Sequence, residues 1–386
     1  MNRLDEIDPA ELGERLRKAR SAAGRTQEEA ATVVGVARTT LVAVERGQRR
    51  IRAEELVGLG RFYRVSINGL LKREAVHVDF SARFRKLPEP NARSTGEDEA
   101  VRILTRLATA SVELEKLLGK PPISHYPPEQ PIERGDVSVQ AEETALALRH
   151  RLGIGLAPVG DIVSLMELEL GIRVFVRPLP SKISGLFAFD ETVGACVLIN
   201  ANHPRNRRVA TAAHELGHFM TNRSDADVVD EHCDMESRDE RFAVAFGAAF
   251  LMPAPSVRRR YREIADEERK FAPRHLILMA HVFGVSTEAM CRRLEKMELI
   301  KQGAWDSLKA RGFGGKEIKQ VLGDPQPEEP SLVLPPRLSL LAAEAYQRGL
   351  QTEEQLCEKL AMDRIEVRKL LDEFASGDVD GLSFGS

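Results

Sequence analysis

The pentapeptide HELGH at 214–218 constrains the fold of this chain more than any other stretch of its sequence. Two histidines four residues apart lie on one face of an α-helix, one turn apart, where two imidazoles can bind the same tetrahedral metal. We therefore predict a helix over the alanine-rich residues 205–221, with His214 and His218 as metal ligands and Glu215 as a general base. The competing interpretation is a plain helix with two surface or core histidines.

A catalytic zinc usually keeps three protein ligands and one open position, so a third ligand is expected downstream. Residues 238–253 are predicted to form a second helix, because phenylalanine recurs there every four residues. On another face of that helix, Glu240 aligns with the small residues Ala243 and Gly247. These small residues would let the two helices approach closely, so that the Glu240 carboxylate could reach the metal.

Other residues near this motif leave alternatives open. His232 and Cys233, in the acidic segment 225–240, are alternative third ligands, although cysteine is more typical of closed structural zinc sites. His203 or His232 is a candidate for stabilising an oxyanion. Cys196 is expected to be a buried strand residue rather than a redox sensor.

The length of the chain, 386 residues, exceeds what one hydrophobic core usually organises, so we expect two to four domains. Runs typical of β-strands occur only in the middle of the chain, at 172–176, 185–189 and 195–200. Helical patterns precede them from 135 and return at 273–311 and 337–375. The predicted fold class is therefore multidomain: an all-α helix-turn-helix bundle, an α+β domain with a small sheet, and an all-α C-terminal region.

Proline-rich segments at 120–131 and 324–336 suggest linkers, because proline neither continues a helix nor donates to a sheet. The predicted division is a helix-turn-helix domain at 1–75, a linker at 76–134 with a helix at 97–119, the α+β domain at 135–311, and a proline-rich linker with C-terminal helices at 312–386. Apolar residues at 97–119 alternate spacings of four and three, which favours a helix packed on its own neighbour or, alternatively, a homodimer contact.

The first 72 residues contain 14 Lys and Arg against 10 Asp and Glu, a local charge of +4 in a chain whose net charge is −3. Within them, two short helices at 26–35 and 36–47 are predicted to cross at a tight turn formed by Gly35 and Val36. The residues expected to face inward at this crossing are Ala30, Val33, Leu41 and Val44.

This segment resembles the Cro/CI-type helix-turn-helix family over some 60 residues, including the Thr-Gln start of helix two and the Glu-x-Gly end of helix three. In that family the third helix enters the major groove of double-stranded DNA. The resemblance implies DNA contacts by Gln27, Arg38, Thr39, Thr40, Ala43, Arg46, Arg49 and Arg50. Arg38 is suited to a bidentate contact with guanine. The alternative is a bundle that binds protein.

The run NRRVATAAHELGHFM, followed by ExxAxxFxxxFLMP, resembles the ImmA/IrrE-like metallopeptidase family from about 140 to 300. Val244 and Gly247 stand where that family usually has Asn and Ala. The resemblance places the third metal ligand on Glu240 and implies a Zn²⁺-dependent endopeptidase. Members of the family typically cleave a Cro/CI-type repressor, so a repressor protein is the implied substrate. Substrate peptide is expected beside an edge strand, for which we take 195–200.

The alternative to an active peptidase is a repressor or antitoxin whose metal site is regulatory or vestigial. The four cysteines form no CxxC pair, and the acidic N-terminus lacks an apolar signal core, so we expect a cytoplasmic protein. No run approaches the roughly 18 apolar residues of a membrane helix. The helices at 275–300 and 338–374 resemble further helix-turn-helices, for which packing or partner binding is favoured over DNA.

Overall fold

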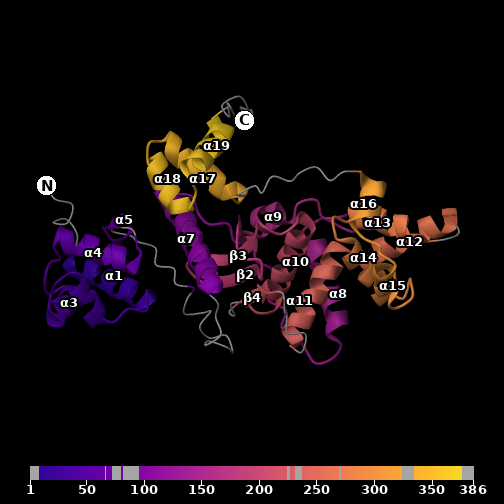
Figure 1. Ribbon diagram of the computed structural model, residues 1–386, viewed down its shortest axis with the longest axis horizontal. Helices are drawn as coiled ribbons and strands as arrows, with labels where there is room; N and C mark the ends of the chain where they lie inside the picture. The colour runs from indigo at the N-terminus through magenta and orange to yellow at the C-terminus, as the bar shows by residue number, and fades with distance from the viewer. Residues whose placement is uncertain are drawn as a thin grey trace. The chain divides into compact units, whose positions relative to one another are not determined.

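The computed structural model describes residues 8–65, 67–71, 80, 95–223, 227–230, 237–268, 271–323 and 334–375. It divides into two compact units, Met1–Ser81 and Ala82–Ser386. Figure 1 shows their elements, coloured in chain order from indigo to yellow. Among the helices of the described ranges, none has the length and apolar character needed to cross a membrane.

The first unit is a small all-α bundle, as its glycine-separated helices predict. Its helices are α1 (Pro9–Ala22), α2 (Gln27–Val33), α3 (Arg38–Glu45), α4 (Ala53–Tyr63) and α5 (Ile67–Leu71). The Thr26 side chain accepts from the backbone N–H of Glu29, and the Glu29 side chain accepts in turn from Thr26, which fixes where α2 begins. Gly35 closes the turn before α3 with a φ of +68°.

One residue predicted to face the core of this bundle does not. Val33 is 50% exposed, whereas Ala30 and Ala31 are buried and Val34 packs against the core. The inward face of α2 is centred among positions 30, 31 and 34, and position 33 lies about 100° from that centre at 3.6 residues per turn. The prediction for Val33 was wrong, while those for Ala30, Leu41 and Val44 are confirmed.

The second unit is built on a four-stranded mixed sheet. Its strands are β1 (Arg173–Arg177), β2 (Ile183–Asp190), β3 (Gly194–Asn200) and β4 (Asp227–Asp230), in the order β1-β3-β2-β4. β1 is parallel to β3, whereas β2 is antiparallel to both β3 and β4. The three strands predicted from the sequence are confirmed, and β4 was not foreseen, because it lies within the acidic segment.

The expectation that residues 195–200 form an edge strand was wrong. β3 lies between β1 and β2, so its backbone pairs on both sides and the edges of the sheet are β1 and β4. The sequence of β3 explains this position, because an almost continuous apolar run suits a strand that is covered on both faces. The position of β3 directly before α10 in the sequence therefore does not predict its position in the sheet.

Helices cover both faces of this sheet. Val174 and Val197 pack in one core with residues of α8 (Val137–Arg151), α10 (Arg205–Thr221) and α11 (Arg238–Leu251). Side chains alternate along a strand, and Arg173 of β1 points to the other face, where it meets α7 (Thr95–Leu118). α7 in turn contacts α17 (Pro336–Gln347) and α18 (Glu353–Leu360), which α19 (Arg364–Ala375) follows.

The remaining helices lie around the face that carries α10. A short helix α9 (Ile162–Leu165) continues into a short π-helix, η2 (Met166–Leu170), before β1. After α11 come α12 (Ala254–Glu268), α13 (Pro273–Val282), α14 (Thr287–Lys296), α15 (Ala304–Ala310) and α16 (Gly315–Leu322). The proline-rich residues 120–131 are bound to this unit: the Ala195 N–H donates to the Tyr126 hydroxyl at 2.9 Å, and the Gln130 N–H donates to Met220 O at 2.8 Å.

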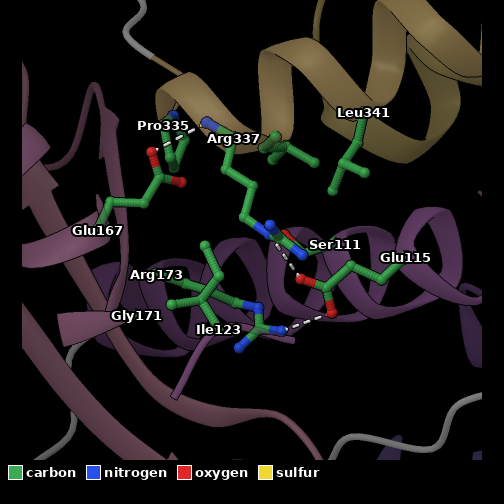
Figure 2. A pocket seen from close by; sticks show the side chains of 10 residues that line it. Ser111, Glu115, Ile123, Glu167, Gly171, Arg173, Pro335, Arg337 and Leu341 are labelled. Carbon is green, nitrogen blue, oxygen red and sulfur yellow. Dashed lines mark hydrogen bonds and ion pairs between the residues drawn. The ribbon is translucent and has the colours of Figure 1, made fainter. Parts of the chain in front are cut away.

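A buried cluster of ion pairs joins α7, β1 and α17 (Figure 2). The Glu115 carboxylate accepts from Arg173 Nη2 at 2.7 Å and from Arg337 Nε at 3.1 Å. The backbone N–H of Arg337 donates to Glu167 Oε2 at 3.0 Å. Burial raises the pKa of Glu167 to about 7. This cluster attaches the C-terminal helices to the face of the sheet opposite α10.

Candidate metal centre and DNA-binding unit

The motif helix α10 is almost wholly internal around its histidines. Glu215 is fully buried, and His214 and His218 are 8% and 9% exposed. Small or apolar residues occupy the neighbouring helix positions, so α10 can pack between the sheet and α11 without a gap. The predicted bounds of this helix, 205–221, are those observed.

α11 lies against α10 because both helices have small residues where they meet. A Cβ built on Gly217 would lie 2.8 Å from Ala243 Cα, and one built on Gly247 would lie 3.3 Å from the Ala213 carbonyl carbon. The Ser237 side chain accepts from the Asp239 N–H and caps the start of α11. The first turn of α11 therefore places Glu240 over the histidines of α10.

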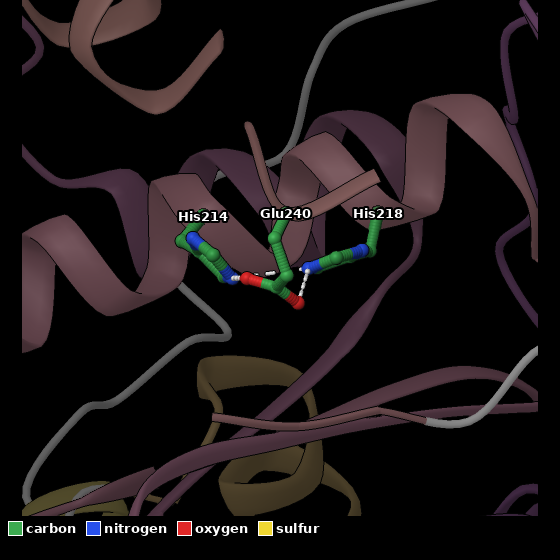
Figure 3. A group of neighbouring side chains, drawn as sticks. All are labelled: His214, His218 and Glu240. Atoms are coloured by element: carbon green, nitrogen blue, oxygen red, sulfur yellow. Dashed lines mark hydrogen bonds and ion pairs between the residues drawn. The ribbon is translucent and has the colours of Figure 1, made fainter. Parts of the chain in front are cut away.

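Three potential ligand groups converge at this point (Figure 3). The Nε2 atoms of His214 and His218 are 3.0 Å apart, and the Glu240 carboxylate oxygens lie 3.4 Å and 3.3 Å from them, respectively. Two ligands that each bind a tetrahedral ion at about 2.0–2.1 Å are about 3.3 Å apart. The group therefore has the donor atoms and the spacing of one metal ligand set.

The alternative site residues have different positions. His232 and Cys233 lie outside the described residues, so they stay alternatives. His203 is 8% exposed, and its Nε2 lies 3.0 Å from Ser181 O. Cys196 is fully buried in β3, where burial raises the pKa of its thiol to about 12, as expected for a strand residue that does not react.

In the first unit, α3 presents its N-terminal end to solvent. Arg38 and Thr39 are exposed, whereas Thr40 and Ala43 are partly buried beside the inward-facing residues of the same helix. Arg46 follows the helix directly and is exposed. This arrangement leaves the predicted base-reading end of α3 accessible to a groove.

Gln27 and Arg49, two of the predicted DNA contacts, are bound to carboxylates of the bundle. Gln27 donates its amide to Glu45 at 2.9 Å, and Glu45 further accepts from Arg20 at 2.6 Å. Both terminal nitrogens of Arg49 donate hydrogen bonds to the Glu55 carboxylate, at 3.0 Å and 2.8 Å, and these bonds lower the pKa of Glu55. These two side chains therefore stabilise the bundle, and their role at DNA remains a prediction. Arg50, the last of that set, is exposed.

The turn between α18 and α19 is similar to the turn between α2 and α3, but the charged residues around it differ. Gly35 between α2 and α3, and Ala361 between α18 and α19, both have left-handed backbone conformations, at φ +68° and +52°. In the C-terminal pair, however, Glu353 binds Arg364 at 2.9 Å and Arg368 at 3.2 Å. Arg364 and Arg368 of α19 are thus paired within the chain, which favours packing or partner binding over DNA.

Residues 168–295 match the model of the IrrE N-terminal-like domain, a metallopeptidase family, and this range contains all four predicted site residues of α10 and α11. The chain carries an IrrE N-terminal-like domain. Residues 11–70 match the model of a helix-turn-helix domain, so the chain joins the two domains, as the sequence resemblances implied. Among curated proteins, none matches the chain.

Proposed function

We propose that this chain is a DNA-binding transcriptional regulator with zinc-dependent endopeptidase activity, which cleaves a Cro/CI-type repressor and so derepresses stress or mobile-element genes. The observation that carries the proposal is the convergence of two imidazole nitrogens and a carboxylate, 3.0–3.4 Å apart, beside the buried Glu215. The helix-turn-helix domain supports regulation at DNA, and the peptidase family supports hydrolysis.

His214, His218 and Glu240 would hold the metal, and their donor set suits zinc. When bound, zinc supplies a Lewis acid that makes water a stronger nucleophile at neutral pH and polarises a carbonyl group. Glu215 takes the proton from the attacking water and delivers it to the leaving amine. An extended substrate segment would pair with an edge strand of the sheet, β1 or β4, since β3 is covered on both sides.

Cleavage is tested by co-expressing the full chain with candidate Cro/CI-type repressors, under DNA damage or metal stress. We expect a repressor fragment with the wild-type chain and none with Glu215→Gln, because the variant keeps the metal ligands but lacks the base. Identical repressor levels and identical derepression with both chains would instead favour a regulator whose metal site is structural or regulatory.

DNA binding is tested with the full chain on its own upstream region. Arg38→Ala should lose about 1–3 kcal/mol of discrimination between specific and random DNA, because it removes a contact to a base edge. Arg46→Ala should weaken binding to specific and random DNA alike. It should also reduce the slope of log affinity against log salt concentration by about 1, because one phosphate contact is lost. If neither variant changes binding, or if binding is insensitive to salt, the unit is a protein-binding bundle.

A further inference from the structure

β2 passes close to the proposed general base at a glycine. A Cβ built on Gly185 would lie 2.9 Å from Glu215 Oε1, 2.6 Å from Thr211 Cγ2 and 3.1 Å from Leu198 O. The φ of Gly185 is outside the left-handed region, so its backbone conformation does not require glycine. Glycine inside a strand weakens it and often marks a close approach by another group. Here two side chains of α10 approach the glycine, the Thr211 methyl group and the Glu215 carboxylate.

A β-bulge fixes this glycine opposite α10. The register between β2 and β4 shifts between Ile183 and Gly185, so Ser184 is an extra residue in β2. Two consecutive residues of β2 therefore contact α10: Ser184 Oγ accepts from Arg207 Nη2 at 3.0 Å, and Gly185 meets Thr211 and Glu215. On α10 the partners Arg207, Thr211 and Glu215 are spaced four residues apart, so they lie on one face of the helix, and this face contacts the bulge.

The other close-packed glycines of this region have a different role. Cβ atoms built on Gly217 and Gly247 would meet the backbone of the facing helix, so these glycines serve the packing of α10 on α11. At Gly185 the contact includes the functional oxygen itself. We propose that Gly185 is a positioning residue, whose missing side chain determines where the Glu215 carboxylate lies. This inference rests on the proposed peptidase function of Glu215.

The first arm of the test measures catalysis in full-length Gly185→Ala. The added methyl group displaces the Glu215 carboxylate, and a displacement near 1 Å can cost about 10²-fold in rate. We therefore expect kcat for repressor cleavage to fall about 10²-fold, with KM and zinc per chain unchanged. Leu186→Ala is the control, because Leu186 is fully buried and points to the other face of the sheet. It should lower the Tm but leave kcat within about twofold of wild type.

The second arm does not depend on activity. Gly185→Ala should lower the Tm by roughly 3–10 °C, as overpacking in a core does. Thr211→Ser removes the Cγ2 contact, and Glu215→Asp withdraws the carboxylate by one methylene. In the double background Thr211→Ser/Glu215→Asp, the Tm loss caused by Gly185→Ala should fall to less than half its wild-type value.

Two results would overturn the proposal. One is a wild-type kcat in Gly185→Ala, and the other is an equal Tm loss from Gly185→Ala in both backgrounds. If the wild-type chain cleaves no repressor, the Tm loss caused by Gly185→Ala is compared in wild type and in the single variant Glu215→Asp, and a smaller loss in Glu215→Asp shows that Gly185 and Glu215 are in contact. A failed peptidase function is thereby distinguished from a failed positioning role.

Discussion

Two buried polar clusters lie on opposite faces of the same sheet, and their chemistry differs. On the α10 face, His214, His218 and Glu240 bring together imidazole nitrogens and carboxylate oxygens, all of which can bind a cation (Figure 3). On the α7 face, the Glu115 carboxylate is bound by the guanidinium groups of Arg173 and Arg337 (Figure 2). The second cluster carries its own cations, whereas the first has the composition of a site that takes one from solution.

The difference separates two reasons for burying polar groups. Buried charges are tolerated when partners of opposite sign neutralise them, and the arginine cluster meets that condition within the chain. A set of converging ligands costs stability in the folded protein unless a metal completes it, so its composition favours a metal-binding role over a purely structural one. The two clusters should therefore respond differently to substitution. Changes in the arginine cluster should lower the stability of the protein, whereas changes in the ligand cluster should lower its metal content.

The largest effect is expected from Glu115→Ala. This change leaves Arg173 buried without its carboxylate, which typically costs about 3–5 kcal/mol. Denaturant unfolding of the full chain, followed by fluorescence of Trp305, its single tryptophan, reports on the second unit. Zinc per folded chain should stay at the wild-type value, since Glu115 lies on the other face of the sheet.

Glu344→Ala is the matched control for Glu115→Ala. Glu344 pairs with Lys120 at 2.6 Å, but the two side chains are 23% and 46% exposed. An exposed pair of this kind contributes about 0–1 kcal/mol. Loss of zinc in Glu115→Ala would show that the two clusters are not independent, and an effect no larger than that of Glu344→Ala would show that the arginine cluster is not structural.

A smaller effect concerns pH. Burial raises the pKa of Glu167 to about 7, against an ordinary value of 4.5; Arg337 and Arg173 oppose the shift and Glu115 adds to it. Because the folded state holds this proton more tightly than the unfolded state, stability should fall as pH rises from about 4.5 to 7 and level off above. We expect a total loss of about 3 kcal/mol in this window, since a pKa shift from 4.5 to about 7 is worth about 1.4 kcal/mol per unit.

Glu167→Gln should remove that slope, since the amide oxygen can still accept from the Arg337 N–H but cannot ionise. Unfolding free energies of both chains at pH 5, 6, 7 and 8 provide the measurement. The variant should equal the wild type near pH 5 and exceed it at pH 8. Parallel curves for the two chains would mean that Glu167 does not titrate in this range.

The convergence of His214, His218 and Glu240 could be predicted from the sequence because its signals are local. The i, i+4 spacing of His214 and His218 specifies one helix face, and the small residues beside Glu240 specify a close neighbour. The arginine cluster has no such signal, since Glu115 finds partners 58 and 222 residues away. Gly185 had at most a weak signal, since it is the first residue of the predicted strand 185–189, and its role can be inferred only from its position beside Glu215.

The errors have the same origin. Val33 has the apolar character of a core residue, but the direction of α2 turns it to solvent. Residues 195–200 were predicted to be a strand, correctly, and an edge, wrongly, because strand order depends on the pairing of β1 with β3. Local patterns predict elements, whereas their partners are determined by packing over long stretches of chain.

The most direct test of the metal centre is the zinc content of the purified full-length chain and four single variants, measured by elemental analysis. We predict about one zinc per chain for wild type and for Glu215→Gln, because three ligands remain in both. Each of His214→Ala, His218→Ala and Glu240→Ala should lower occupancy. Full zinc in Glu240→Ala, together with zinc loss in His232→Ala or Cys233→Ala, would contradict the assignment of the third ligand and with it the proposed centre.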